Sequence, residues 1–156
     1  MKFALKRASE TDAGLIWNMQ VESFAQMYAR YRDDETSPAK EPLDKVIARL
    51  RQPHTYYYLI ETDEGTAGAI RVVDFREAGK PKRISPLFIL PGFRNRGFAQ
   101  AAIRAAEEIH GRENWTLDTI LEEEGNCRLY EKMGYRQNGR QERINDRMTL
   151  VYYEKE

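Results

Sequence analysis

One segment, which begins at residue 83 and ends near residue 110, constrains the fold more than any other part of the chain. A strand-like segment over residues 83–90, which ends in the apolar run 87–90, leads into a glycine-flanked loop over residues 92–97 and then into an alanine-rich stretch. This order predicts a buried strand, a turn, and a helix over Phe98–His110 that lies close to a sheet, because alanine side chains are short. The next strand-like stretch, residues 115–121, predicts a strand parallel to the first, since a helix connects the two in a right-handed crossover.

The rest of the chain alternates between helical and strand patterns. Apolar residues three and four positions apart predict helices, and runs of aromatic and β-branched residues predict strands. The expected strands are 1–7, 56–61, 68–75 and 148–153; the expected helices are a segment that follows capping residues at 9–12 and ends near Tyr31, a segment between Pro42 and Pro53, and 126–133. Asn138-Gly139 and Asn145-Asp146 are typical of turns. We therefore expect one α/β domain over residues 1–156, built on a mixed sheet.

Charge and hydropathy exclude several classes of protein. Lys+Arg and Asp+Glu both number 25, so the net charge is zero and a nucleic-acid-binding surface is not expected. The longest apolar run is far shorter than the ~20 residues that cross a bilayer, which argues against a membrane partner. Charged residues near the start argue against an export signal, so we expect a cytoplasmic protein. One cysteine and two histidines give no cluster with metal-ligand spacing, and no metal is expected.

The loop before the alanine-rich helix predicts an anion site. The first amides of a helix have no partners within the helix and carry positive dipole potential, which favours a phosphate group. Arg94 and Arg96 add positive charge, and Gly97 permits close approach of the backbone. The alternative is an ordinary turn with a solvated basic edge. Phe98-Ala99 stands where a Walker loop needs Lys-Ser/Thr, and no GxGxxG motif occurs, so nucleotide hydrolysis and dinucleotide binding are disfavoured.

Two motifs resemble those of the GCN5-related N-acetyltransferase (GNAT) family. Arg94-Asn95-Arg96-Gly97-Phe98-Ala99 matches the signature Arg/Gln-x-x-Gly-x-Gly/Ala, and residues 129–135, LYEKMGY, are similar to the family's LYEKLGF. The resemblance covers the whole chain in its order of elements. It implies the GNAT-like acyl-CoA N-acyltransferase fold, whose mixed sheet is splayed open in the centre and holds acetyl-CoA as co-substrate.

The resemblance also implies roles for individual residues. The cofactor-binding residues would be Leu87, Phe88 and Ile89 at the thioester and pantetheine, and Arg94, Asn95, Arg96, Gly97, Phe98 and Ala99 at the pyrophosphate. Tyr130 would be the catalytic residue that protonates the departing thiolate. Family members often carry an Asn seven residues before that Tyr; here Glu123 stands at this position, and we assign the pantetheine contact to Asn126.

The expected reaction transfers an acetyl group to an amine of a small molecule or a peptide. The acidic run at residues 122–124 is expected to steer a cationic amine, and the alternative for this run is a solvated surface. Tyr130 could instead be a packed helix aromatic, and the whole chain could be a non-catalytic CoA-binding or interaction module. Cys127 is expected to be a packed free thiol, and His54 and His110 to lie on the surface. Neither a monomer nor a homodimer is excluded.

Overall fold

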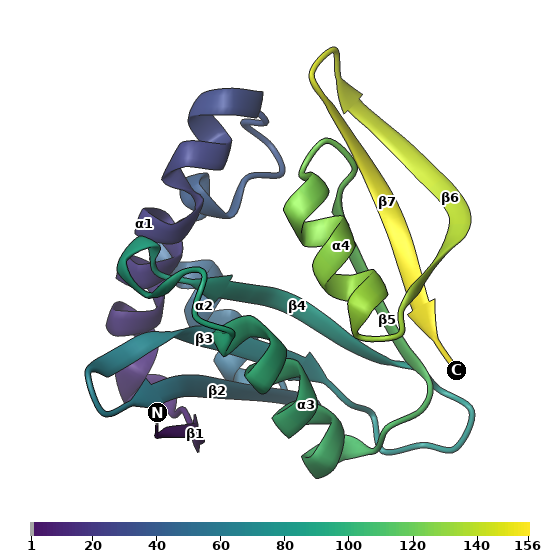
Figure 1. Cartoon of the computed structure of the whole chain (residues 1–156). Helices are drawn as coiled ribbons and strands as arrows, with labels where there is room; N and C mark the ends of the chain where they lie inside the picture. The colour runs from purple at the N-terminus through teal and green to yellow at the C-terminus, as the bar shows by residue number, and fades with distance from the viewer. Residues whose placement is uncertain (1) are drawn as a thin grey trace.

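Seven strands form one mixed sheet in the computed structural model, which describes residues 2–156 (Figure 1). Their order is β1-β2-β3-β4-β5-β7-β6, and every neighbouring pair is antiparallel except β4 and β5, which are parallel. The strands are β1 (Phe3–Arg7), β2 (Thr55–Thr62), β3 (Gly65–Val73), β4 (Lys82–Ile89), β5 (Trp115–Ile120), β6 (Arg136–Asn145) and β7 (Met148–Lys155). The helices are α1 (Ala13–Tyr31), α2 (Leu43–Arg51), α3 (Phe98–His110) and α4 (Glu124–Lys132).

The sheet opens between β4 and β5. These strands pair only at Lys82↔Trp115 and Arg83↔Thr116, and beyond these residues they diverge, as Figure 1 shows. Ser85 and Pro86 lie just beyond the residues of β4 that pair with β5, and these two residues pair with neither β3 nor β5. Proline has no amide hydrogen to donate to a ladder, which explains in part why pairing stops there. The predicted splay of the central sheet is therefore confirmed.

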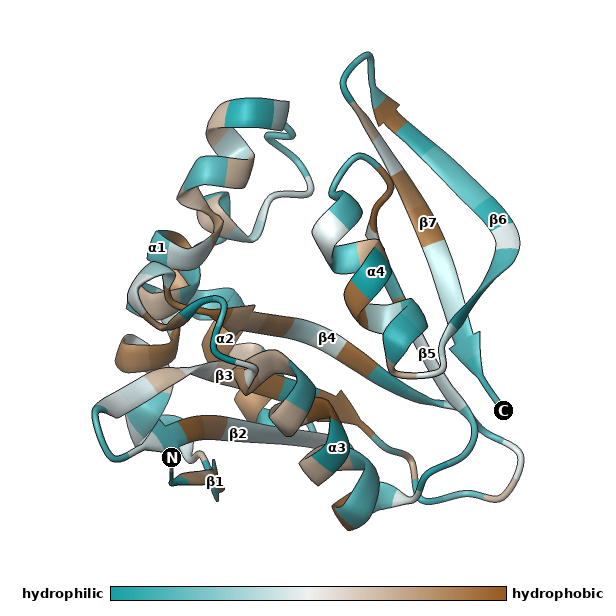
Figure 2. Cartoon of the chain, viewed as in Figure 1, coloured by the Kyte–Doolittle hydropathy of each residue, from teal (hydrophilic) through white to brown (hydrophobic). Residues whose placement is uncertain are grey.

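Helices cover both faces of the sheet. Side chains alternate between the faces along a strand, so Tyr57 and Leu59 pack beneath α1 and α2, whereas Tyr58 and Ile60 pack on the side of α3. The alanines of α3 that face the sheet are fully buried, which lets the helix lie close to it. In Figure 2, β2 and β4 each include a brown, hydrophobic segment, whereas β6 is mostly hydrophilic.

Most predicted elements are present with small shifts at their ends. The predicted helix Phe98–His110 has these bounds in the structure, and the predicted parallel strand pair with its crossover helix is confirmed. The first strand begins at Phe3, and residue 1 of the predicted strand lies outside the described residues. The fourth helix begins at Glu124, two residues earlier than predicted.

One predicted turn is wrong. Asn138 and Gly139 lie inside β6, where pairing with β7 is interrupted between Gln137 and Gln141 and then resumes. Gly139 adopts φ 90°, so its left-handed conformation forms an irregularity within the strand instead of a hairpin. The hairpin between β6 and β7 follows Asn145, as predicted. In the part of the chain that the structure describes, no helix is both long and apolar enough to span a membrane.

Candidate active site

Two cavities lie where β4 and β5 diverge. The loop cavity, of 390 Å³, is bounded by the end of β4, the loop before α3, the first turn of α3, and α4. The splay cavity, of 290 Å³, lies between residues 83–87 of β4 and residues 118–120 of β5, and the connection between α1 and α2 closes one side. The residues common to both linings are Phe24, Met27, Leu87, Asn126 and Tyr130. The two cavities therefore meet at these side chains, which we call the junction.

The loop cavity brings together nearly all residues that the sequence predicted to bind a cofactor. Those that line it are Leu87, Phe88, Ile89, Arg94, Asn95, Gly97, Phe98, Ala99 and Asn126, together with Tyr130. Arg96 is the exception: its guanidinium pairs with Glu64 at the β2–β3 turn, with Nη1 2.7 Å from Oε2. Its positive charge is thus balanced at the surface, outside the lining of this cavity.

The start of α3 presents a run of backbone amides without acceptors to the loop cavity. Gly97 caps the helix in the left-handed region, at φ 82°, and the first helical amide with a backbone acceptor is that of Ala101, 3.0 Å from the Gly97 carbonyl. The amides of residues 95–100 have no hydrogen-bond acceptor among residues 2–156. Arg94 fixes the loop by donating to the carbonyls of Ile89 and Ser23, at 3.0 and 2.7 Å. A run of free amides at a helix start can bind a phosphate group.

Tyr130 lies at the junction with its hydroxyl free. The residue is only 9% exposed, and its ring packs edge-on against Tyr135, with centroids 6.2 Å apart, and tilted against Tyr153. Within the described chain its hydroxyl has no hydrogen-bond partner. Burial, and less strongly the nearby charge of Asp118, raise the pKa of Tyr130, so the hydroxyl stays protonated at neutral pH. The ring therefore packs as the alternative interpretation expected, and the hydroxyl is also available as a proton donor.

Asn126 lies at the junction and offers its side-chain amide there, whereas Glu123 lines only the loop cavity. Its Nδ2 donates to Oγ1 of Thr119 on β5 at 3.4 Å. The carboxylate of Glu123 lines the loop cavity, where it accepts hydrogen bonds from the Tyr31 hydroxyl and the Arg30 guanidinium. The pairing with Arg30 neutralises this acid.

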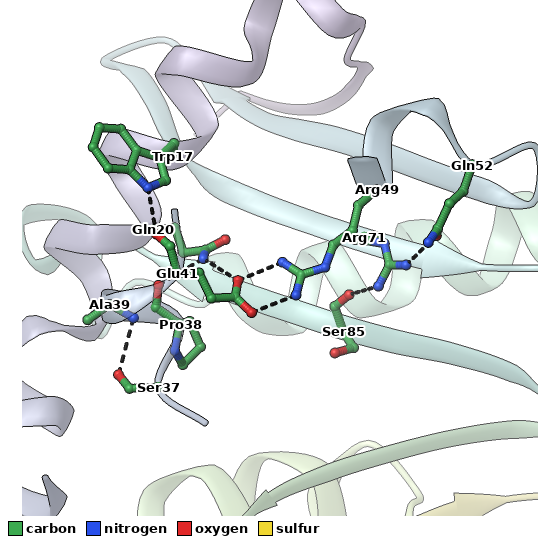
Figure 3. Close-up of polar contacts among 10 residues, drawn as sticks. All are labelled: Trp17, Gln20, Ser37, Pro38, Ala39, Glu41, Arg49, Gln52, Arg71 and Ser85. Carbon is green, nitrogen blue, oxygen red and sulfur yellow. Dashed lines mark hydrogen bonds and ion pairs between the residues drawn. The ribbon is translucent and has the colours of Figure 1, made fainter. Parts of the chain in front are cut away.

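A polar cluster that the sequence did not predict borders the splay cavity, and its members Glu41 and Arg49 line that cavity (Figure 3). Arg49 holds the Glu41 carboxylate through two hydrogen bonds of 2.7 and 2.6 Å, and Gln20 donates to the same carboxylate at 2.8 Å. Burial raises the pKa of Glu41, but the bonds from Arg49 and Gln20 outweigh it, so this pKa lies below its usual value. The cluster brings together side chains from α1, α2 and the connection between them, which no local sequence pattern reveals.

Arg71 extends the cluster to β4. Its guanidinium donates to the Ser85 carbonyl at 2.7 Å and to the Gln52 side chain at 2.8 Å. Burial and the nearby charge of Arg49 lower the pKa of Arg71 to about 10, which still leaves it charged at neutral pH. The Ser85 carbonyl belongs to the segment of β4 that pairs with neither neighbour, so Arg71 satisfies a backbone group at the point where the sheet opens.

None of the acids at residues 122–124 lines the splay cavity, whereas Glu123 lines the loop cavity, so steering of a cationic amine by this run stays a prediction. Glu122 accepts a hydrogen bond from the Thr149 amide at 2.8 Å, Glu123 pairs with Arg30, and Glu124 is exposed. The carboxylates that line the splay cavity are instead Asp33, Glu41 and Asp118. They come from distant parts of the sequence, which is why their proximity was missed.

His110 is buried, so its predicted surface position is wrong. Its side chain is 0% exposed and lies between Asp74, whose Oδ2 is 2.8 Å from Nδ1, and Tyr58, whose hydroxyl is 2.9 Å from Nε2. Burial lowers the pKa of His110, although Asp74 opposes this effect. His54 is half-buried and stacks on Phe75. Cys127 is a buried free thiol, as predicted, and residues 2–156 contain no group of three or more potential metal ligands.

Comparisons with known proteins agree with this geometry. The model of the acetyltransferase (GNAT) family matches residues 17–135. Spermidine N-acetyltransferase from Vibrio cholerae, solved with CoA and spermine, superposes with a TM-score of 0.75 at 17% identity, covering 97% of this chain and 93% of that one. The PaiA N-acetyltransferase from Thermoplasma acidophilum, solved with coenzyme A, superposes with a TM-score of 0.71 at 15% identity over 100% of both chains. A search of curated protein sequences finds no significant match.

Proposed function

Because the chain belongs to the acetyltransferase (GNAT) family, we propose that it transfers the acetyl group of acetyl-CoA to a primary amine. The observation that carries this proposal is the junction of the two cavities at Tyr130. On one side lie free amides suited to a diphosphate, and on the other lies a cavity lined by carboxylates, which suits an amine. The acetyl group would then sit between its donor and its acceptor.

The loop cavity fits acetyl-CoA in its chemistry. The amides of residues 95–100 and the positive end of α3 would bind the pyrophosphate. The edge of β4 over residues 87–89 has no partner strand on the side of β5, so its backbone groups can accept and donate hydrogen bonds to the amides of pantetheine. Asn126 offers one more amide at the junction.

Transfer requires one bond to form and one to break. The lone pair of a neutral amine attacks the thioester carbonyl, and the tetrahedral intermediate collapses to an amide as the C–S bond breaks. Tyr130 donates its proton to the departing sulfur, and the proton released from the nitrogen returns through solvent to the tyrosinate. Binding both reactants at the junction supplies effective concentration, to which proton donation adds a factor of about 10²–10⁴.

The raised pKa of Tyr130 is compatible with this role. Burial raises the pKa of Tyr130, and the same surroundings would disfavour a thiolate that leaves into this cavity, because burial disfavours both anions. The free hydroxyl supports the assignment, since no protein acceptor within residues 2–156 competes for its proton.

Release of CoA thiol in the presence of acetyl-CoA and a panel of primary amines tests the proposal. We expect steady release that depends on the amine, and an acetylated product 42 mass units heavier, the mass of C₂H₂O, the net gain when acetyl replaces a hydrogen. Calorimetric binding of CoA without turnover of any amine would contradict an enzymatic role and support a non-catalytic binding module.

A further inference from the structure

The splay cavity carries one carboxylate more than its guanidinium groups balance. Its charged lining residues are Asp33, Glu41, Asp118, Arg49 and Arg83. Arg49 neutralises Glu41, and Arg83 pairs with Asp118 at 3.0 Å. Asp33 forms no ion pair within the described residues. The net charge of the lining is therefore −1, and it resides on Asp33.

Asp33 is buried by the turn that follows α1. Arg32 ends the helix in the left-handed region, at φ 52°, and the chain turns back so that Asp33 is only 6% exposed. Its Oδ2 accepts a hydrogen bond from the Thr36 hydroxyl at 2.8 Å. Its Oδ1 has no donor among residues 2–156. Asp33 lines the splay cavity, so this carboxylate, which has no cationic partner among the described residues, is available to a cation that enters the cavity.

The position of Asp33 defines a second binding point for the acceptor. Asp33 lines the splay cavity and not the loop cavity, so it lies away from the junction at which the acetyl group is transferred. Much of the remaining lining is apolar and includes Met27, Ile120, Met148 and Leu150. An apolar wall favours a methylene chain, and the lone carboxylate favours a cation at the end of that chain.

We propose that Asp33 binds a second ammonium group of the acceptor, so that the acceptors are linear aliphatic diamines and polyamines. One nitrogen reacts at the junction, and another, still protonated, neutralises Asp33. The inference rests on the acetyl transfer proposed above. Such a pair selects for acceptors with two cationic ends, since an alkylamine leaves Asp33 without a partner.

Two amines of equal length test this selectivity. 1,4-Diaminobutane and n-pentylamine have the same number of heavy atoms and differ in that an ammonium replaces a methyl group. We expect the wild-type protein to show a kcat/KM about 10- to 100-fold higher for the diamine, the range for one charge-assisted contact. The preference should decrease as ionic strength rises, because salt screens the charges.

Substitution of Asp33 tests whether this carboxylate causes the preference for 1,4-diaminobutane over n-pentylamine. Asp33→Asn keeps an acceptor for Thr36 but removes the charge, and should lower kcat/KM for 1,4-diaminobutane about 10- to 100-fold while n-pentylamine and the KM for acetyl-CoA stay unchanged. Asp34→Asn is the matched control: Asp34 is the exposed neighbour and lines neither cavity, so this variant should keep the preference.

The outcomes separate the inference from the proposed function. Equal kcat/KM for the two amines in the wild-type protein, or an undiminished preference in folded Asp33→Asn, would overturn the role of Asp33 while acetyl transfer stands. Absence of thiol release with every amine would overturn both. Should Asp33→Asn not fold, the comparison of amines by the wild-type protein and its salt dependence still decide the question.

Discussion

Replacement of Tyr130 by phenylalanine tests the role of the hydroxyl proton, because the substitution removes only the hydroxyl group. The hydroxyl has no partner within the described chain, and the ring contacts with Tyr135 and Tyr153 do not involve it. Tyr130→Phe therefore removes no hydrogen bond of the folded protein, and the free energy of unfolding should change by less than about 0.5 kcal/mol. The loss of general acid catalysis should lower the rate of acetyl transfer by about 10²–10⁴, or ~2.7–5.4 kcal/mol in the activation barrier.

The assay must report the chemical step. Single-turnover mixing of acetyl-CoA-loaded protein with saturating amine, quenched at intervals, measures acetyl transfer without product release. Calorimetry should give the same affinity for acetyl-CoA in both proteins, since the phenyl ring keeps the shape of the cavity. Tyr135→Phe is a suitable control, because the Tyr135 hydroxyl donates to Glu107 at 3.0 Å and Tyr135 lines neither cavity.

The expected result is a slow Tyr130→Phe variant with normal stability and normal acetyl-CoA affinity, and a Tyr135→Phe variant whose transfer rate equals that of the wild type. A Tyr130→Phe single-turnover rate within about threefold of wild type would refute the role of Tyr130, because general acid catalysis contributes at least ~100-fold. The packed-aromatic interpretation would then be correct.

Two further predictions concern the loop cavity and the buried histidine. In Gly97→Asn, asparagine should tolerate the left-handed conformation at φ 82°, so the variant should fold. Its side chain should enter the space beside the free amides and raise the KM for acetyl-CoA by about tenfold or more. An unchanged KM in the folded variant would place the pyrophosphate elsewhere. In the folded protein the pKa of His110 lies below its ordinary 6.5, so the unfolded chain binds a proton first as the pH falls. The free energy of unfolding should therefore fall as the pH drops below about 7, and His110 should contribute at most ~1.4 kcal/mol per pH unit. Denaturant titrations at several pH values should show a smaller slope in His110→Gln, and an equal slope in both proteins would contradict the assignment.

The local parts of this fold follow from the sequence because they depend on near neighbours. Helix α3 begins after Gly97, which takes a left-handed conformation, and ends before Gly111, which also has positive φ. Both glycines mark the ends in the sequence itself, and the two family motifs lie at the start of α3 and at the end of α4. The same locality explains why nearly all predicted cofactor-binding residues line one cavity.

The parts that failed depend on contacts between distant residues. Asp33 and Asp118 line one cavity although 85 positions separate them in the sequence, so no local pattern indicates that they lie together. His110, at the last turn of an amphipathic helix, was expected at the surface, but Tyr58 of β2 and Asp74, which follows β3, contact it from more than 30 residues away in the sequence. No periodicity within a helix encodes such partners.

The two cavities lie where β4 and β5 stop pairing, and the chain supplies a hydrogen-bond partner for part of the β4 backbone that is left unpaired there. Opening the sheet leaves backbone groups of β4 without a partner strand, and a buried backbone group without a hydrogen bond costs free energy comparable to a lost bond. The bond from Arg71 to the Ser85 carbonyl offsets part of this cost at the start of the divergence, and the loop cavity leaves residues 87–89 accessible to a ligand farther along. A co-substrate with amides of its own could then pair with β4 as a strand would, so the feature that weakens the sheet would also give the proposed co-substrate acetyl-CoA its hydrogen-bonding edge. The polar cluster thus supports the proposed active site, in part through Gln20, Gln52 and Arg71, which line neither cavity.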